Sequence, residues 1–321
     1  MEQFRVFFKA LSLCLAIPLG LTAGAQADSF TIYEGASLTD VSFFGNLNQY
    51  DTTITTSYGS YGCQVTAYTN ALVYLQKAYP GIYGTKLVSN YLGTTLDDTA
   101  VTLGGANYLN VQVTRDGNGT ITGASSNFRD QVWGMSTYIN EKVPGQTSYA
   151  AQMLPVPNQV GGNPSGGWTM ARYQPTWVSM NATYPTEAFL YNALSNHQGL
   201  VIDWNQFSVG KSHLLTITGL TWDSSTNKGT LYFIDPVGGK QHNSPFSQAS
   251  DGSLWLDYGE YAPGTPWKKA DSITNWWYSG NVRITLAMAE GPAPTPLPST
   301  LLLLGSGLLG LAGFGRRLRR S

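Results

Sequence analysis

The sequence is short of cysteine, histidine and charge, and each shortage excludes a class of protein. Its 321 residues include two cysteines and three histidines, and only 12% are charged. Cys14 lies in an N-terminal apolar run, which leaves Cys63 as the only other cysteine and excludes an intramolecular disulfide once that run is removed. No metal-ligand spacing and no phosphate-cradling glycine loop is present, so we expect neither a metal nor a cofactor.

The N-terminus has the order of parts that is typical of a signal peptide. Two basic residues precede the apolar run Ala10 to Leu21, which is shorter than the roughly 20 residues of a spanning helix. Ala25-Gln26-Ala27 then gives a small-x-small sequence ahead of a polar residue. This order predicts that residues 1–27 are a signal peptide, which signal peptidase removes after Ala27.

The C-terminus carries a proline-rich segment, a short apolar segment and an arginine cluster. Residues 291–298 contain four prolines and are expected to be a linker, because proline fixes φ and lacks an N–H donor. Residues 300–314 are apolar apart from Ser306, and four arginines follow. We expect this segment to be a transmembrane helix that anchors the chain transiently with its arginines in the cytoplasm, although its 15 residues fall below the usual span.

Pro296-Leu297-Pro298 and the sorting segment 299–321 together resemble a PEP-CTERM tail. That resemblance implies processing by an exosortase-type enzyme and delivery to the cell surface or extracellular matrix, where extracellular polysaccharide is a further expected partner. Leu297 stands where the family usually has glutamate.

Between these ends, residues 28–290 are long enough for one large or two small domains, and we take them as one. They hold 12 basic and 18 acidic residues, a net charge of −6, so nothing basic remains to favour nucleic acid or an anionic membrane. Short alternating stretches predict many strands and few helices, an α+β domain. Two helices are expected, from Cys63 to Tyr79 and from about Thr186 to His197.

Cys63 stands at the first turn of its expected helix. A helix N-terminus favours negative charge and so makes a reactive thiolate available. Free cysteine is more often a small buried apolar side chain than a nucleophile, so position alone leaves both interpretations open.

A thiolate nucleophile needs a base, and the base needs an acceptor that fixes its tautomer. Of the three histidines, His197 closes a helix and His242 lies in a glycine-rich loop, where both have ordinary structural roles. His213 instead opens a strand, and it is the candidate base.

The strands that contain His213 and Asp235 are expected to pair as an antiparallel hairpin. With Leu215 opposite Phe233, His213 lies opposite Asp235, and all four side chains share one face. This register predicts a His-Asp pair at the open end of an apolar face. An ordinary hairpin whose polar residues mark its end is the alternative.

Three short segments resemble the C39-like branch of the papain-like cysteine peptidases: Gly62 to Ala67, Ser212 to Gly219, and Leu231 to Pro236. The resemblance implies a papain-like fold in which the helix that carries the cysteine packs on an antiparallel β-sheet. It also implies Cys63 as nucleophile, His213 as general base and then acid, and Asp235 as orienter. Papain-like transglutaminases share this order.

An oxyanion site needs donors aimed at the developing negative oxygen. The backbone N–H of Cys63 is one candidate. The family commonly supplies the second from a glutamine six residues before the cysteine, where this chain has Ser57. Gln49 and Gln64 are the candidates here, and we prefer Gln49 because Gln64 lies on the helix.

We therefore expect an exported cysteine peptidase that hydrolyses amide bonds of peptides or proteins through an acyl-thioester on Cys63. One alternative is a transglutaminase-like acyltransferase. The other is a non-catalytic extracellular matrix or exopolysaccharide-associated protein that retains the fold without turnover.

Overall fold

The computed structural model describes residues 29–33, 43–88, 94–153, 178–181, 183–206, 211–258 and 280–293. The predicted signal peptide, the apolar C-terminal segment and the arginine cluster lie outside these residues. Within this part of the chain, no helix is both long and apolar enough to cross a membrane.

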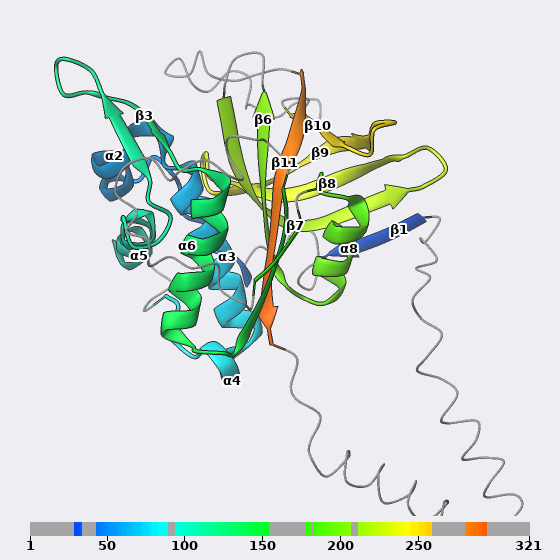
Figure 1. Ribbon diagram of the computed structural model, residues 1–321, viewed down its shortest axis with the longest axis horizontal. Coiled ribbons are helices and arrows are strands. Elements are labelled where there is room, and N and C mark those ends of the chain that lie inside the picture. The colour runs from blue at the N-terminus through cyan, green and yellow to red at the C-terminus, as the bar shows by residue number, and fades with distance from the viewer. Residues whose placement is uncertain are drawn as a thin grey trace, which may run out of the picture.

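Six consecutive strands form a closed antiparallel barrel (Figure 1). They are β6 (Gly199–Gln206), β7 (Lys211–Asp223), β8 (Lys228–Asp235), β9 (Lys240–Gln248), β10 (Leu254–Tyr258) and β11 (Gly280–Pro292). Each strand pairs with the next, and β11 also pairs with β6, which closes the ring.

The barrel is filled by alternate side chains of its strands, as the period of two along a strand requires. This cluster includes Ile202, Trp204, Leu215, Ile217, Leu231, Phe233, Phe246, Leu256 and Ile284. Helix α8 (Glu187–Ser195) adds Leu190, Ala193 and Leu194 to the same core. The predicted second helix is thereby confirmed, and Thr186 caps it by accepting a hydrogen bond from the Phe189 N–H at 3.2 Å.

Three further strands extend the sheet beyond the barrel. β1 (Ser29–Tyr33) pairs with the far end of β7, past the last residue of β7 that pairs with β6. β4 (Thr147–Met153) pairs with the end of β11, and β5 (Val178–Asn181) runs parallel to β4.

The end of β11 corrects the predicted start of the linker. Gly291 and Pro292 belong to the strand and pair with β4, whereas the sequence predicted a linker from residue 291. The N–H of Ala293 donates to the Gln146 carbonyl on the β4 side, so the nitrogen of Pro292 faces the other side. Pairing with β6 has already ended there at Glu290, so the missing N–H of proline breaks no ladder bond.

A helical layer covers one outer side of the barrel (Figure 1). It consists of α2 (Thr52–Tyr58), the single turn η2 (Gly59–Tyr61), α3 (Cys63–Ala78), α4 (Pro80–Tyr83), α5 (Thr94–Gly104) and α6 (Phe128–Lys142), with the hairpin β2 (Gln112–Arg115) and β3 (Ile121–Ser125). The first predicted helix is confirmed as α3, which ends one residue before Tyr79. α3 packs on β6 and β7, and nearly all of its side chains are buried.

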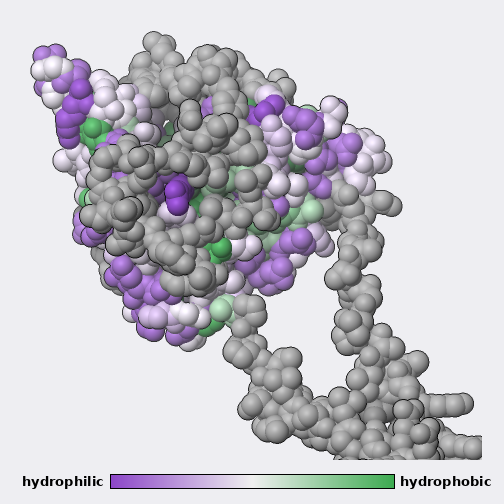
Figure 2. Space-filling model, viewed as in Figure 1, coloured by the Kyte–Doolittle hydropathy of each residue, from purple (hydrophilic) through white to green (hydrophobic). Residues whose placement is uncertain are grey.

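Much of the coloured surface in Figure 2 is hydrophilic. In Figure 2 hydrophilic residues spread over the tip of the β2–β3 hairpin, and hydrophobic residues form small separate areas. Phe43, at 37%, is the one large apolar side chain that is exposed among the described residues. Most large apolar side chains are therefore buried in two cores, one inside the barrel and one beneath the helices.

The register of the β7–β8 hairpin differs from the prediction. Ile217 lies opposite Phe233, whereas we predicted Leu215 at that place, and a bulge follows Ile217. Turn length fixes the register of a hairpin, and Asp223 and Lys228 close a turn of four residues here. The apolar pattern alone does not contain that information, because it looks the same after a shift of two residues.

Candidate active site

Cys63 is the first residue of α3 and is partly buried. Gly62 precedes it as the N-cap, and a side chain on Gly62 would overlap a methyl group of Ile54. The carbonyl of Gly62 accepts hydrogen bonds from the N–H and the hydroxyl of Thr66, at 3.1 and 2.8 Å, which fixes the first turn of the helix. The sulfur is thus placed at the end of a helix where N–H groups lack intrahelical partners.

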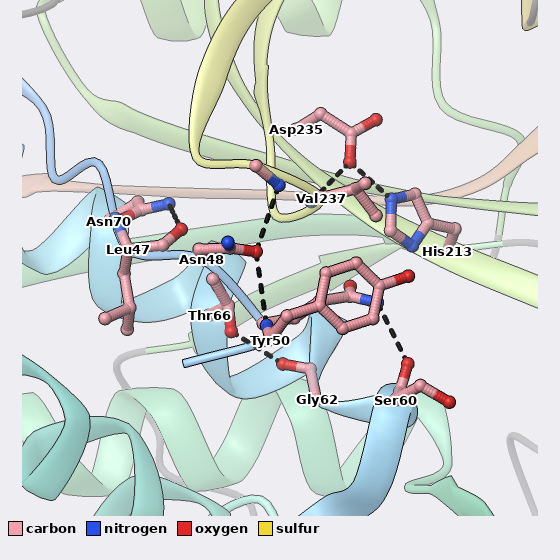
Figure 3. Close-up of polar contacts among 12 residues, drawn as sticks. Leu47, Asn48, Tyr50, Ser60, Gly62, Thr66, Asn70, His213, Asp235 and Val237 are labelled. Carbon is pink, nitrogen blue, oxygen red and sulfur yellow. Dashed lines mark hydrogen bonds and ion pairs between the residues drawn. The ribbon is translucent and has the colours of Figure 1, made fainter. Parts of the chain in front are cut away.

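His213 and Asp235 form a buried pair at the open end of the β7–β8 hairpin (Figure 3). His213 Nε2 lies 3.0 Å from Asp235 Oδ1, and the two residues are 8% and 0% exposed. The same oxygen accepts a hydrogen bond from the Val237 N–H at 2.8 Å. The predicted proximity is present although the predicted register is wrong, because a shift of two residues keeps both side chains on one face as diagonal neighbours.

Cys63 lies close enough to His213 to raise the pKa of the ring through a side-chain hydrogen bond and through its charge. Nε2 is engaged by Asp235, so Nδ1 is the ring nitrogen that remains for the sulfur. The imidazole therefore lies between a carboxylate and a thiol. Three segments distant in the sequence, at residues 63, 213 and 235, meet at this point.

Opposing effects act on the imidazole of His213. Burial lowers its pKa, but the negative charge of Asp235, the hydrogen bond to Asp235 and the contact with Cys63 together outweigh burial and raise the pKa to about 10. A pKa raised in this way favours the imidazolium near neutral pH, a form in which both ring nitrogens carry a proton. The Trp204 ring packs edge-on against it, with 5.8 Å between centroids.

Gln49 lies against Gly62, the residue before the candidate nucleophile. It is 4% exposed, and its backbone N–H donates to the Pro236 carbonyl at 2.8 Å. Its Nε2 donates to the Ser60 carbonyl at 2.9 Å, and its Oε1 has no hydrogen-bond partner among the described residues. The amide carries a second N–H, which is the one that can donate to an oxyanion.

The remaining candidates fall elsewhere. Gln64 is buried as the second residue of α3. His197 follows α8, and its carbonyl accepts a hydrogen bond from Tyr79 at 2.7 Å. His242 was predicted in a glycine-rich loop, but it lies within β9 opposite Phe233, because β9 begins immediately after the two glycines of the turn.

Two buried carboxyl groups that the sequence analysis did not single out lie outside this cluster. Asp203 is 1% exposed, and its Oδ2 accepts a hydrogen bond from Gln131 at 3.4 Å. Burial raises the pKa of Asp203 to about 8, against the lowering effects of Gln131 and of the charge on His213. Burial also raises the pKa of Glu290 well above its ordinary value. The sequence signal that could have identified Asp203 is its place as a carboxylate inside the apolar run Leu200 to Trp204.

The titration of Asp203 predicts a pH-dependent stability. Because its folded pKa lies above its unfolded value of 3.8, its contribution is fully present below about pH 4 and is lost as the pH rises through about 8. We expect the free energy of unfolding to fall over that range, and Asp203→Asn to flatten the fall because an amide does not titrate. Urea unfolding at pH 4, 6 and 8 measures both. If the free energy of unfolding falls with pH equally steeply in Asp203→Asn, the titration of Asp203 is not the cause of the fall.

Comparison with known proteins identifies the tail. Residues 294–320 match the PEP-CTERM protein-sorting motif. The chain is therefore an exported protein with an exosortase sorting tail, a feature of surface-associated proteins. No curated protein matches the chain. The C39-like resemblance between Cys63 and Pro236 stays a prediction.

Proposed function

We propose that this exported protein is a cysteine peptidase that hydrolyses amide bonds through an acyl-thioester on Cys63. The observation that carries the proposal is the position of the His213 ring, which has Nε2 on Asp235 and lies close enough to Cys63 to interact with its side chain. A nucleophile, a base and an orienting carboxylate in mutual contact are the parts that acyl transfer requires. The papain-like fold and the roles of these residues are part of the proposal.

In the acylation step, the thiolate of Cys63 forms a bond to the carbonyl carbon of the substrate, and the carbonyl oxygen becomes negative. Collapse of this intermediate breaks the carbon–nitrogen bond, and the imidazolium of His213 gives its proton to the leaving amine. Its raised pKa keeps that proton available near neutral pH. Asp235 holds the ring in place through Nε2 throughout.

In the deacylation step, the now neutral His213 takes a proton from water, and the resulting hydroxide attacks the thioester carbon. The carbon–sulfur bond breaks, the acid leaves, and the thiolate–imidazolium pair is restored. In both steps the backbone N–H of Cys63 and the free N–H of Gln49 are the proposed donors to the oxyanion. Loss of one such donor typically costs about 100- to 1000-fold in rate.

The C-terminal end of β11 lies far from the candidate site. Trp204 lies opposite both His213 on β7 and Ile284 on β11. From Ile284, β11 continues for eight residues to Pro292, a distance of about 26 Å at roughly 3.3 Å per residue. The described chain therefore ends at the end of the barrel away from the site.

The test is an assay of the purified mature chain on unstructured proteins and peptides between pH 5 and 9, with products identified by mass. We expect products whose new carboxyl termini arise by cleavage of internal peptide bonds of the substrate. A second series with an added primary amine distinguishes hydrolysis from acyl transfer, because a transglutaminase-like enzyme yields the amide of that amine instead. If neither product forms at any pH, the enzyme proposal is contradicted and the matrix-protein alternative remains.

A further inference from the structure

A short segment ahead of α2 connects the helix that carries the nucleophile with the turn that follows Asp235. We call residues 45–50 the strap. At one end the N–H of Leu47 donates to Asn70 Oδ1 at 2.9 Å, and the N–H of Gly45 donates to the Asn70 carbonyl at 3.2 Å. Asn70 lies two turns after Cys63 on α3, so these bonds tie the strap to the nucleophile's own helix.

At its other end the strap contacts the turn between β8 and β9 (Figure 3). Asn48 Oδ1 accepts a hydrogen bond from the Gly238 N–H at 3.0 Å and another from the Tyr50 N–H at 3.1 Å. Gly239 presses on the Asn46 carbonyl so closely that a side chain would overlap it, and its φ of 60° disfavours other residues. The turn is thus docked on the strap by a side chain and by close backbone packing.

The docked turn is the one that orients the carboxylate. Asp235 Oδ1 accepts the Val237 N–H at 2.8 Å and the His213 ring at 3.0 Å, and Gly238 is the next residue along. Fixing the N–H of Gly238 therefore helps to fix the turn that follows Asp235 and whose Val237 N–H holds the carboxylate. The Gln49 N–H also holds the start of the turn, through the Pro236 carbonyl at 2.8 Å. Loss of the Gly238 bond would therefore loosen the Val237 part of the turn, whose N–H holds the carboxylate.

We propose that Asn48 is a positioning residue, which holds the Asp235 carboxylate on His213 and thereby couples the β8–β9 turn to the Cys63 helix. This inference rests on the proposed function and deepens it. A side-chain carbonyl oxygen of this length suits the role because it accepts both N–H groups. The backbone of Asn48 has its own contact, since its N–H donates to Asp51 Oδ2 at 3.2 Å. Removal of the side chain leaves the strap attached to α3 through the bonds of Leu47 and Gly45 to Asn70.

Three variants separate the two bonds that Asn48 accepts. Asn48→Ala removes both. Asn48→Ser keeps an acceptor for the local turn at Tyr50 but is too short to reach Gly238, so it tests the bond across the site in a folded strap. Asn48→Asp keeps both bonds and is the conservative rescue. Asn118→Ala is the control, because Asn118 is exposed at the tip of the β2–β3 hairpin.

The readout is the charge on His213, followed through alkylation of Cys63. Iodoacetate is an anion and iodoacetamide is neutral, so the ratio of their rates follows the imidazolium, whose positive charge attracts the anion. In the wild type the ratio should fall as the pH rises through about 10. In Asn48→Ala and Asn48→Ser the fall should move to lower pH by about one unit, because the ring keeps its carboxylate for only part of the time.

Turnover gives the second readout. We expect Asn48→Ala and Asn48→Ser to lower kcat by about 10- to 100-fold with little change in KM, and Asn48→Asp to stay within about threefold of the wild type. An unshifted alkylation ratio in Asn48→Ser with its thermal midpoint retained would overturn the inference, as would failure of Asn48→Asp to rescue. If the wild type cleaves no peptide, the proposed function fails while the alkylation ratio still decides the role of Asn48.

Discussion

Cys63→Ala is expected to lower amide hydrolysis by at least about 10⁴-fold and to leave the thermal midpoint nearly unchanged. The nucleophile has no substitute among the described residues, which contain no other cysteine. Cys63 is only partly buried at the start of α3, so loss of one sulfur removes few packing contacts. Initial rates with a cleaved peptide and a calorimetric scan of each protein measure the two quantities.

The same variant separates the enzyme from the matrix-protein alternative. A core cysteine would show the reverse pattern, with destabilisation of about 1 kcal/mol or more from the cavity and no change in activity. Cys63→Ser serves as the matched control for packing, because it keeps the size of the side chain. Retention of turnover in Cys63→Ala would exclude the acyl-thioester outright.

His213→Ala is expected to lower turnover by about 10³- to 10⁴-fold and to slow alkylation of Cys63. The same substitution at His197 or His242 should change neither, because one follows α8 and the other lies on β9 opposite Phe233. Equal losses in all three variants would indicate a general effect of histidine removal on folding, and would contradict a specific role for His213. Steady-state rates on one peptide, with circular dichroism for each variant, make the comparison.

The free energy of unfolding should also depend on the titration of His213. The folded pKa of His213, about 10, lies above the unfolded value of about 6.5. Its contribution is therefore fully present below about pH 6.5 and is lost as the pH rises through about 10. The wild type should accordingly lose its advantage in unfolding free energy over His213→Gln across that window. A constant difference from pH 6 to 10 would mean that the ring does not hold its proton against Asp235.

The sequence was sufficient to predict the elements with strong local signals. α3 has a glycine before its first turn and an apolar face, and α8 has a threonine cap. α6 was missed, although Asn127 caps it by accepting the Asp130 N–H at 2.8 Å, because its buried face includes polar and glycine residues that hide the period.

The parts of the site that the sequence did not predict depend on contacts between distant segments. Closure of the barrel by β6 and β11 joins strands about 80 residues apart, and no local pattern encodes it. The strap is a polar loop whose role arises only where Asn48 meets Gly238, 190 positions along the chain. The proximity of His213 and Asp235 was predicted for a register that is wrong, and it holds because parity survives a shift of two.

The most direct test of the proposed chemistry is the rate at which iodoacetamide alkylates Cys63 at pH 6. A free thiol, with a pKa of about 8.5, is almost wholly protonated there. If the imidazolium of His213 holds the sulfur as a thiolate, Cys63 should react at least about tenfold faster than a small free thiol, and His213→Ala should remove the difference. A Cys63 that reacts no faster than the free thiol, with or without His213, would contradict the proposed nucleophile.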